Sequence, residues 1–518
     1  MPTDLRTDIT NALHAFTGGD LTANCSHLLD VLGYRSEKRY PLEPNTAQNF
    51  VATFATARPF NAEHALTDAW TEANVLFQLT DREVAQREQM DLALDDGGWN
   101  RGLYRSFLFL AVGLSGERYS RSALATITRA VNRLFDMPTP IFFRYGDKLT
   151  LAIILHRPGK RAASKDVLEK VTLIKDIDLR RPHAAHVRIL EELALSSLRN
   201  AQSVGDFDEL QSAWAKTLDI SELNKRFYQE LANWYYWAVE TVTFPRGDSQ
   251  EDEETRNAVA VIRLITRLIF VWFIKEKGLV PDALFDRQRV SQLLHDMGDD
   301  SDGYYKAILQ NLFFATLNTE MNTPAQPRNR IFRSAAESGG YNRHYGVHNV
   351  YRYADLFRLD EAGALALFAE IPFLNGGLFE CLDKEIVREG KRKMIPVDGF
   401  SERDDNPLHA PNVLFFGKEQ SFDLNEVFGT HNKPYKVRGL FDIFHRYKFT
   451  VEENTPIDEE VALDPELLGK VFENLLAAYN PETRTTARKQ TGSFYTPREI
   501  VDYMVDEALI AYLGQQVT

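Results

Sequence analysis

The stretch between residues 106 and 156 constrains the fold of this chain more than any other part of the sequence. Residues 107–112 (FLFLAV) form an uninterrupted apolar run, which is typical of a buried β-strand. Residues 122–135 then repeat apolar side chains at helical spacing. The apolar runs at 140–145 and 149–155 flank Gly146, Asp147 and Lys148, and this pattern predicts a β-hairpin. We therefore expect an α+β domain over residues 96–205, with a mixed sheet and a hairpin near residues 106–156.

The remainder of the sequence is mainly α-helical in pattern. A chain of 518 residues is too long for one hydrophobic core, so we expect several domains. Residues 1–95 show helical spacing, for example at Ala65, Trp70, Val75 and Leu79. The further ranges that we expect are a helical connector, a helical and irregular domain and a closing segment, at 206–250, 255–455 and 460–518. An acidic break with a glycine, at residues 247–254, is the best candidate for a domain boundary.

Composition excludes several classes of protein. The apolar share of 44% and the charged share of 26% are those of a globular protein, which argues against disordered, collagen-like and membrane classes. The apolar run at 258–274 contains Arg263 and Arg267, so it predicts a buried core helix rather than a membrane span. Cys25 and Cys381 are the only cysteines, which excludes a disulfide framework and a thiolate-rich zinc site. Without a secretory signal at the start, we expect a cytoplasmic protein.

The last segment contains a complete helix-start signal. Thr496 suits the N-cap, Pro497 suits the first helical position, and Glu499 lies three residues after the cap, as in a capping box. A helix is therefore predicted from Pro497 onward. Its apolar residues fall on one stripe that needs a partner surface, namely Ile500, Val501, Met504, Val505, Ala508, Leu509 and Tyr512. The positive end of such a helix suits an anionic group.

Residues 491–497 (TGSFYTP), followed by Ile500 and Val501, resemble the first motif of adenine-N6 DNA methyltransferases whose cofactor motif precedes the catalytic one. The resemblance implies the start of a class I methyltransferase domain, S-adenosylmethionine as cofactor, and contacts to its methionine end from Phe494, Tyr495 and Thr496. Residues 467–476, 372–379 and 447–450 are similar to segments upstream of this motif in type IIG-like restriction-modification and phage-defence methylases, and residues 166–176 extend the likeness.

Two parts of a working methyltransferase of this class are missing from the sequence. These are the glycine-rich turn after a first strand and the Asn/Asp-Pro-Pro-aromatic loop that accepts hydrogen bonds from the flipped adenine. The nearest segment, residues 480–483 (NPET), lacks the second proline and the aromatic. We therefore expect no methyl transfer, and no catalytic residue, from this polypeptide by itself. It is expected to be part of a longer enzyme or one half of a split one.

Type IIG enzymes usually have an amino-terminal nuclease, which needs an acidic residue and a Glu-x-Lys to hold Mg²⁺. The only Glu-x-Lys here is residues 389–391 (EGK), in a region that predicts no strand. The α+β domain offers Asp136, Asp147 and Asp176 without such a pair. This domain is therefore expected to be nuclease-like without a metal site, and no metal is predicted. Nuclease activity of this domain is kept as an alternative function.

Paired histidines occur at helical spacing, His183 with His186 and His344 with His348. Neither pair has a third ligand nearby in the sequence, so they are interpreted as surface or capping residues rather than zinc ligands.

Because the net charge is −14, contact with DNA requires a local basic surface. Arg484, Arg488 and Lys489 lie just before the closing motif and are candidates for contacts to phosphates of double-stranded DNA. A solvated linker that makes no contact with DNA is an alternative role for these three residues, and the sequence favours both roles equally. A further hypothesis is a non-catalytic DNA-binding or scaffold subunit whose partner is a separate methyltransferase chain or another defence-system subunit. No membrane partner is expected.

Overall fold

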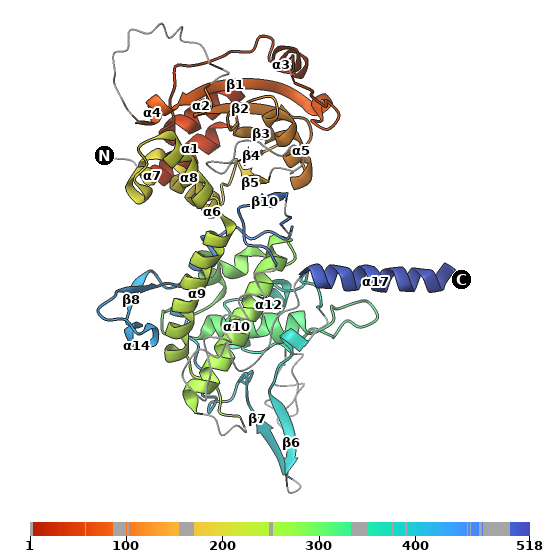
Figure 1. The fold of residues 1–518 in the computed structure, drawn as a ribbon. Helices are drawn as coiled ribbons and strands as arrows, with labels where there is room; N and C mark the ends of the chain where they lie inside the picture. Colours follow the sequence, from red (N-terminus) through yellow and green to blue (C-terminus); the bar gives the residue numbers. More distant parts are fainter. Residues whose placement is uncertain are drawn as a thin grey trace. The chain divides into compact units, whose positions relative to one another are not determined.

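The structure is a computed structural model, and its described residues are 4–56, 58–85, 100, 103–154, 170–247, 252–332, 350–374, 377–388, 391–452, 454, 455, 457–465, 469 and 498–517. The chain divides into two compact units (Figure 1). The first, which we call the sheet unit, combines Met1–Phe227 with Phe444–Asp464. The second, which we call the helical unit, combines Tyr228–Ile443 with Pro465–Thr518. The domain ranges expected from the sequence stay a prediction.

A six-stranded mixed sheet forms the centre of the sheet unit, with the strand order β1-β2-β3-β4-β5-β10. β2 and β3 are parallel, as are β5 and β10, and the other neighbours are antiparallel. The strands are β1 (Trp70–Thr80), β2 (Ser106–Leu114), β3 (Ile141–Tyr145), β4 (Lys148–Ile153), β5 (Val171–Asp178) and β10 (Asp458–Glu460).

The mixed sheet and hairpin predicted for residues 106–156 are confirmed. Every residue of β2 is buried, as its unbroken apolar run indicates. Helix α5 (Arg121–Asn132) follows, and the hydroxyl of Ser120 accepts a hydrogen bond from Ala123 N at its start. β3 and β4 form the hairpin, and Gly146 in its two-residue turn has φ +49°, a conformation that glycine adopts without strain.

Residues 70–80 form strand β1, whereas the spacing of Ala65, Trp70, Val75 and Leu79 predicts a helix. Residues 73–80 are all buried in β1, and its sequence does alternate, because polar Asn74, Gln78 and Thr80 lie between apolar Ala73, Val75, Phe77 and Leu79. Pairing with β2 decides its conformation, because tertiary contacts override a weak local preference.

Helices account for the rest of the sheet unit, as the sequence predicts. They are α1 (Leu5–Ala15), α2 (Leu21–Val31), α3 (Ala47–Phe54), η1 (Thr67–Ala69), α4 (Asp81–Ala85), α6 (Ala184–Leu193), α7 (Leu195–Gln202) and α8 (Phe207–Thr217). Phe50 and Phe54 of α3 pack with Phe135 in the core, where the ring centroids of Phe54 and Phe135 are 5.4 Å apart. Asn132 donates to Thr139 O and accepts from Thr139 N, which fixes the turn between α5 and β3.

The helical unit contains the apolar helix α10 (Glu253–Glu276). By length and composition α10 is able to cross a membrane, but 78% of its most apolar window is buried inside the structure, as expected for a core helix. Arg267 in this helix is buried and donates to Asp398 and to backbone carbonyls. The other helices of the helical unit are η2 (Asp282–Phe285), α11 (Arg287–Leu293), η3 (Tyr304–Leu317), η4 (Ala354–Leu356), α12 (Glu361–Ala366), η5 (Gly377–Phe379), α13 (Val413–Phe416), α14 (Asn425–Phe428) and α17 (Arg498–Val517). Two helices, α9 (Ile220–Thr241) and α15 (Leu440–His445), contain the residues at which the division between the units falls.

Two hairpins lie in the part of the helical unit where the sequence predicts irregular structure. They are β6 (Lys384–Arg388) with β7 (Lys391–Ile395), and β8 (Gln420–Phe422) with β9 (Tyr435–Val437). The expectation that no strand surrounds residues 389–391 is wrong, because Lys391 begins β7. Glu389 and Gly390 lie outside the described residues, between the two strands.

The helix predicted at the closing motif is confirmed as α17. Its capping residues Thr496 and Pro497 lie outside the described residues. Apolar side chains of α17 are exposed, among them Met504 at 60%, Leu509 at 53% and Tyr512 at 60%. The described residues therefore show no surface that covers the apolar stripe, and a class I methyltransferase domain stays a prediction.

Candidate functional site

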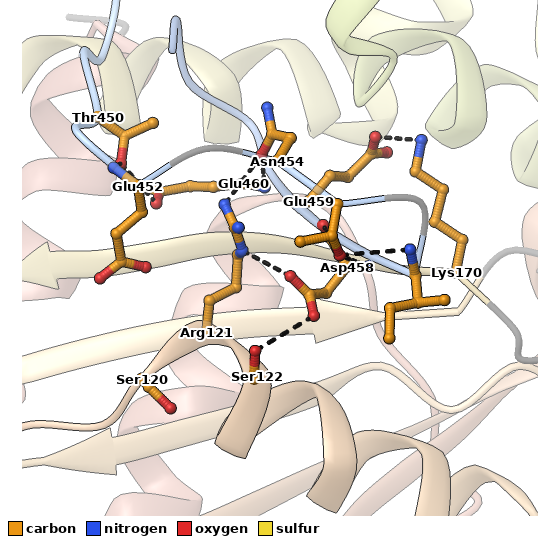
Figure 2. Close-up of polar contacts among 12 residues, drawn as sticks. Ser120, Arg121, Ser122, Lys170, Thr450, Glu452, Asn454, Asp458, Glu459 and Glu460 are labelled. Carbon is orange, nitrogen blue, oxygen red and sulfur yellow. Dashed lines mark hydrogen bonds and ion pairs between the residues drawn. The ribbon is translucent and has the colours of Figure 1, made fainter. Parts of the chain in front are cut away.

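The candidate site lies at the edge of the sheet unit where the chain returns to the sheet as β10. Asp458, Glu459 and Glu460 pair in parallel with Val171, Thr172 and Leu173 of β5. Val171 N donates to Ile457 O at 3.0 Å, and Val461 N donates to Leu173 O at 2.9 Å, so the pairing continues on both sides of β10. Three consecutive carboxylates are thereby brought to a sheet edge, as Figure 2 shows.

The carboxylate of Asp458 is buried against the start of α5 (Figure 2). Arg121 Nε donates to Asp458 Oδ1 at 2.7 Å, and the two side chains are only 7% and 2% exposed. Ser122 Oγ lies 3.5 Å from Asp458 Oδ2. An anion beside the first turn of a helix is also favoured by the helix dipole. A buried charge of this kind needs its partner, because either ion alone would lack compensation.

Asn454 connects the loop before β10 to the same cluster. Its Oδ1 accepts from Arg121 Nη1 at 3.0 Å and from Glu460 N at 2.9 Å. Its Nδ2 donates to Asp464 Oδ2 at 3.1 Å. The amide therefore orients the guanidinium of Arg121 and the backbone of β10 together.

Glu459 and Glu460 have different environments on the same strand. Glu459 accepts from Thr172 Oγ1 at 2.9 Å and forms an ion pair with Lys170. Glu460 is buried and accepts from Thr450 Oγ1 at 3.2 Å. Burial raises the pKa of Glu460 to about 7, although the charge of Lys175 opposes this shift. Glu460 is therefore a group that exchanges a proton near neutral pH.

Strand β5 adds a second charged pair next to Glu460. Lys175 is buried, and its Nζ lies 2.5 Å from Asp176 Oδ2. Tyr145 OH donates to Asp176 Oδ1 at 2.7 Å, and burial, with the charge of Asp176, raises the pKa of Tyr145. Asp176 has φ +57°, a left-handed conformation that costs energy in a non-glycine residue and is often found at functional sites.

Lys175 and Asp176 line an open cleft of about 910 Å³. Residues of both charge signs line this cleft, among them Asp147, Arg180 and Glu452. Cations of this kind bind phosphates, and carboxylates bind metal ions or activate water. The cleft and the cluster around β10 together form the polar edge of the sheet unit.

The cofactor contacts and DNA contacts predicted from the sequence lie outside the described residues. These are Phe494, Tyr495 and Thr496 for the cofactor, and Arg484, Arg488 and Lys489 for DNA. All six stay predictions.

Two of the three aspartates proposed from the α+β domain line the same cleft, and the third lies elsewhere. Asp136 forms an ion pair with Arg58. Asp147 and Asp176 both line the polar cleft, and Asp147 Oδ2 lies 2.9 Å from Arg180 Nη2. Within the described ranges, no group of three or more His, Cys, Asp or Glu side chains is arranged to hold a metal ion.

The histidine pair at α6 has one capping and one buried member. His183 Nδ1 accepts from Ala185 N at 3.1 Å, which confirms its capping role. His186 is buried rather than at the surface, and burial lowers its pKa well below the ordinary value. His344 and His348 lie outside the described residues.

Sequence reasoning missed the acidic strand β10 and its partners Arg121 and Lys175. A faint signal was present, because Asp458-Glu459-Glu460 leads directly into the apolar run Val461-Ala462-Leu463, which is buried. The apolar run indicates burial, but nothing local indicates that the carboxylates are buried with it.

Comparison with known proteins gives one partial similarity. The chain is 27% identical over 248 residues to a Methanocaldococcus jannaschii protein named as a candidate type II restriction enzyme and methyltransferase. The match covers 48% of this chain and 14% of the length of that relative. No protein-family model and no solved structure matches the chain. The chain is thus distantly related, across about half of its length, to a candidate restriction-modification protein.

Proposed function

We propose that this chain is the amino-terminal, DNA-acting part of an adenine-N6 DNA methyltransferase of a restriction-modification or phage-defence system. The observation that carries the proposal is the agreement between the motif at residues 491–497 and the similarity to a restriction enzyme and methyltransferase. In this proposal the protein acts on double-stranded DNA in the cytoplasm. The chain supplies the region before the catalytic core and one side of the cofactor site.

Exposure of α17 supports the same proposal. An apolar helix that directly follows the motif is suited to pack on the sheet of a methyltransferase domain. Leu509 in the apolar stripe is 53% exposed, so the helix offers apolar area for such a contact. S-adenosylmethionine, when bound, supplies the methyl group, and Phe494, Tyr495 and Thr496 would hold its methionine end.

A reconstitution assay with tritiated S-adenosylmethionine tests the proposal. The 518-residue chain alone is expected to incorporate no tritium into DNA, because its sequence has no glycine-rich turn and no Asn-Pro-Pro-aromatic loop. Addition of a polypeptide that carries these two parts is expected to produce methylation at adenine. Incorporation by the chain alone, or a reconstituted mixture that stays inactive on DNA, would contradict the proposal.

Variants of α17 make the assay more specific. Leu509→Ser, in the apolar stripe, is expected to weaken the reconstituted activity without changing the unfolding of the chain, because this side chain is exposed. Glu507→Gln, on the same helix, is the matched control and is expected to reconstitute like the unmodified chain. If both variants lose the same share of the reconstituted activity, α17 does not make an apolar contact with the added polypeptide.

A second candidate function is cleavage of phosphodiester bonds by the sheet unit. The polar cleft favours it, because Lys175 and a carboxylate on a strained residue, Asp176, lie together at its wall. Carboxylate oxygens are the ligands that Mg²⁺ prefers, and Asp176 and Glu452 both line this cleft. Supercoiled plasmid with Mg²⁺ should be nicked by the chain and spared by Asp176→Asn, with Asp136→Asn as control. An intact plasmid with the unmodified chain would exclude this candidate.

A further inference from the structure

The hairpin of β6 and β7, which we call the basic ribbon, is the most positively charged element among the described strands. Its ten strand residues include five Lys or Arg and a single Glu. Figure 1 shows the ribbon extending away from the helices of the helical unit. Lys384 on β6 and Lys393 on β7 are exposed. This local charge is opposite in sign to the net charge of −14.

A carboxylate fixes the base of the basic ribbon. Asp383 is buried directly before β6, and its Oδ1 accepts from the backbone N of Val397, Asp398 and Gly399 at 2.5, 2.7 and 3.0 Å. Its Oδ2 accepts from Phe400 N at 2.7 Å. Four hydrogen bonds to one carboxylate hold the turn after β7 against the start of β6. The ribbon therefore begins from a rigid base.

A cavity of about 240 Å³ opens beside this base, where Lys384 pairs with Ile395. Both residues line the cavity. Three arginines, Arg246, Arg256 and Arg263, complete its charged lining, and none of the described residues that line it is acidic. Guanidinium and ammonium groups around a small cavity are the donors that bind phosphate.

Arg263 lines this cavity and makes a long contact with a carboxylate. Its Nη2 is 3.8 Å from Asp398 Oδ1, a longer contact than the 3.2 Å between Asp398 and Arg267 Nη1. Leu382 N donates to the other oxygen of Asp398 at 2.8 Å. Among the described residues, no group accepts a hydrogen bond from Nε of Arg263, although this atom is buried. The Asp398 carboxylate is therefore satisfied mainly by other donors.

We propose that the cavity binds a phosphate of double-stranded DNA and that the basic ribbon follows the duplex from there. The inference rests on the proposed function, since it names the surface by which this DNA-acting chain holds its substrate. Lys384 belongs to both the cavity and the ribbon, so the two cationic surfaces are continuous. A two-stranded ribbon fits the major groove of B-DNA, whereas the deep, narrow major groove of duplex RNA does not admit side chains.

Salt-dependent DNA binding tests this surface. The variant Arg246→Gln, Lys384→Gln, Lys393→Gln removes three exposed cations. With a fluorescent duplex of random sequence, the slope of log K against log salt is expected to fall by about 2 to 3, at about 0.9 per phosphate contact. Binding should weaken equally for different sequences, because phosphate contacts do not read bases.

The matched control is Lys277→Gln, Arg289→Gln, Lys418→Gln, which removes three exposed cations elsewhere in the same unit. A slope like that of the unmodified chain is expected for this control. Equal slopes for the two triple variants, no binding of duplex DNA by the unmodified chain, or tighter binding of single-stranded RNA would overturn the proposal. The reconstitution assay of methylation is a separate readout, so a ribbon without DNA contact is distinguishable from a chain without methyltransferase function.

Discussion

The acidic strand β10 and the basic ribbon differ in whether their charged side chains are buried or exposed. The carboxylates of β10 are buried, and Arg121 and Lys170 form ion pairs with Asp458 and Glu459. The cations Lys384 and Lys393 of the ribbon are exposed to solvent. The first arrangement holds two distant parts of the chain together. The second presents cations at the protein surface. Burial, rather than the number of charges, separates a structural cluster from a binding surface.

The largest effect is expected from Arg121→Ala in the β10 cluster. Removal of the cation leaves Asp458 buried without its ion-pair partner, which should lower the free energy of unfolding by about 3–5 kcal/mol. Urea unfolding followed by circular dichroism measures this. Arg6→Ala, which breaks a pair whose arginine is 54% exposed, is the control and should cost about 1 kcal/mol or less. Similar losses in both variants would show that the buried cluster does not hold β10.

The next effect is a dependence of stability on pH that comes from Glu460. Its pKa in the folded chain is about 7, above its ordinary value of 4.5, so the folded state favours the protonated form. The resulting stabilisation is complete below pH 4.5 and is lost as the pH rises through 7, by roughly 3 kcal/mol. Unfolding at several pH values should show this fall for the unmodified chain and a flatter profile for Glu460→Gln. Parallel profiles would contradict the assignment.

A smaller effect is expected from Asp383→Asn at the base of the ribbon. The amide keeps one acceptor oxygen but loses the charge and the second acceptor, so we expect a loss of about 2 kcal/mol. Hydrogen exchange should increase at residues 397–400 before it increases elsewhere. Asp405→Asn, at an exposed pair with Arg403, is the control. Unchanged exchange at residues 397–400 would mean that the carboxylate does not rigidify the base.

The smallest effect is expected from Lys393→Gln on the ribbon itself. An exposed cation contributes little to folding, so the free energy of unfolding should change by less than about 0.5 kcal/mol. A thermal unfolding scan measures this change. A large loss of stability would mean that Lys393, like Arg121, is needed for folding. The two regions would then not differ in the role of their charges.

Local sequence patterns were sufficient for the centre of the sheet unit. β2, α5 and the β3–β4 hairpin were predictable because each is determined by periodicity or turn chemistry within about a dozen residues. β1 was predicted as a helix because the spacing of Ala65, Trp70, Val75 and Leu79 was given more weight than the alternation of polar and apolar residues over 73–80. The hairpin β6–β7 was missed because its strands are rich in Lys and Arg, which do not indicate a strand by themselves.

Local sequence patterns could not predict the candidate site. Arg121 and Asp458 are separated by 337 residues, and only the folded sheet brings them within 2.7 Å. Asp176 was named as a candidate, but its left-handed backbone and its contact with Tyr145 depend on the packing of β4 and β5. The predicted cofactor contacts follow from a motif and so did not require the fold.

The return of the chain at β10 also sets an order for synthesis. The segment Tyr228–Ile443 is inserted between the two parts of the sheet unit, so β5 emerges from the ribosome long before the strand that covers its edge. At roughly 5–20 residues per second this interval is on the order of tens of seconds. During that time the open edge of β5 presents unpaired backbone groups that are able to pair with another chain.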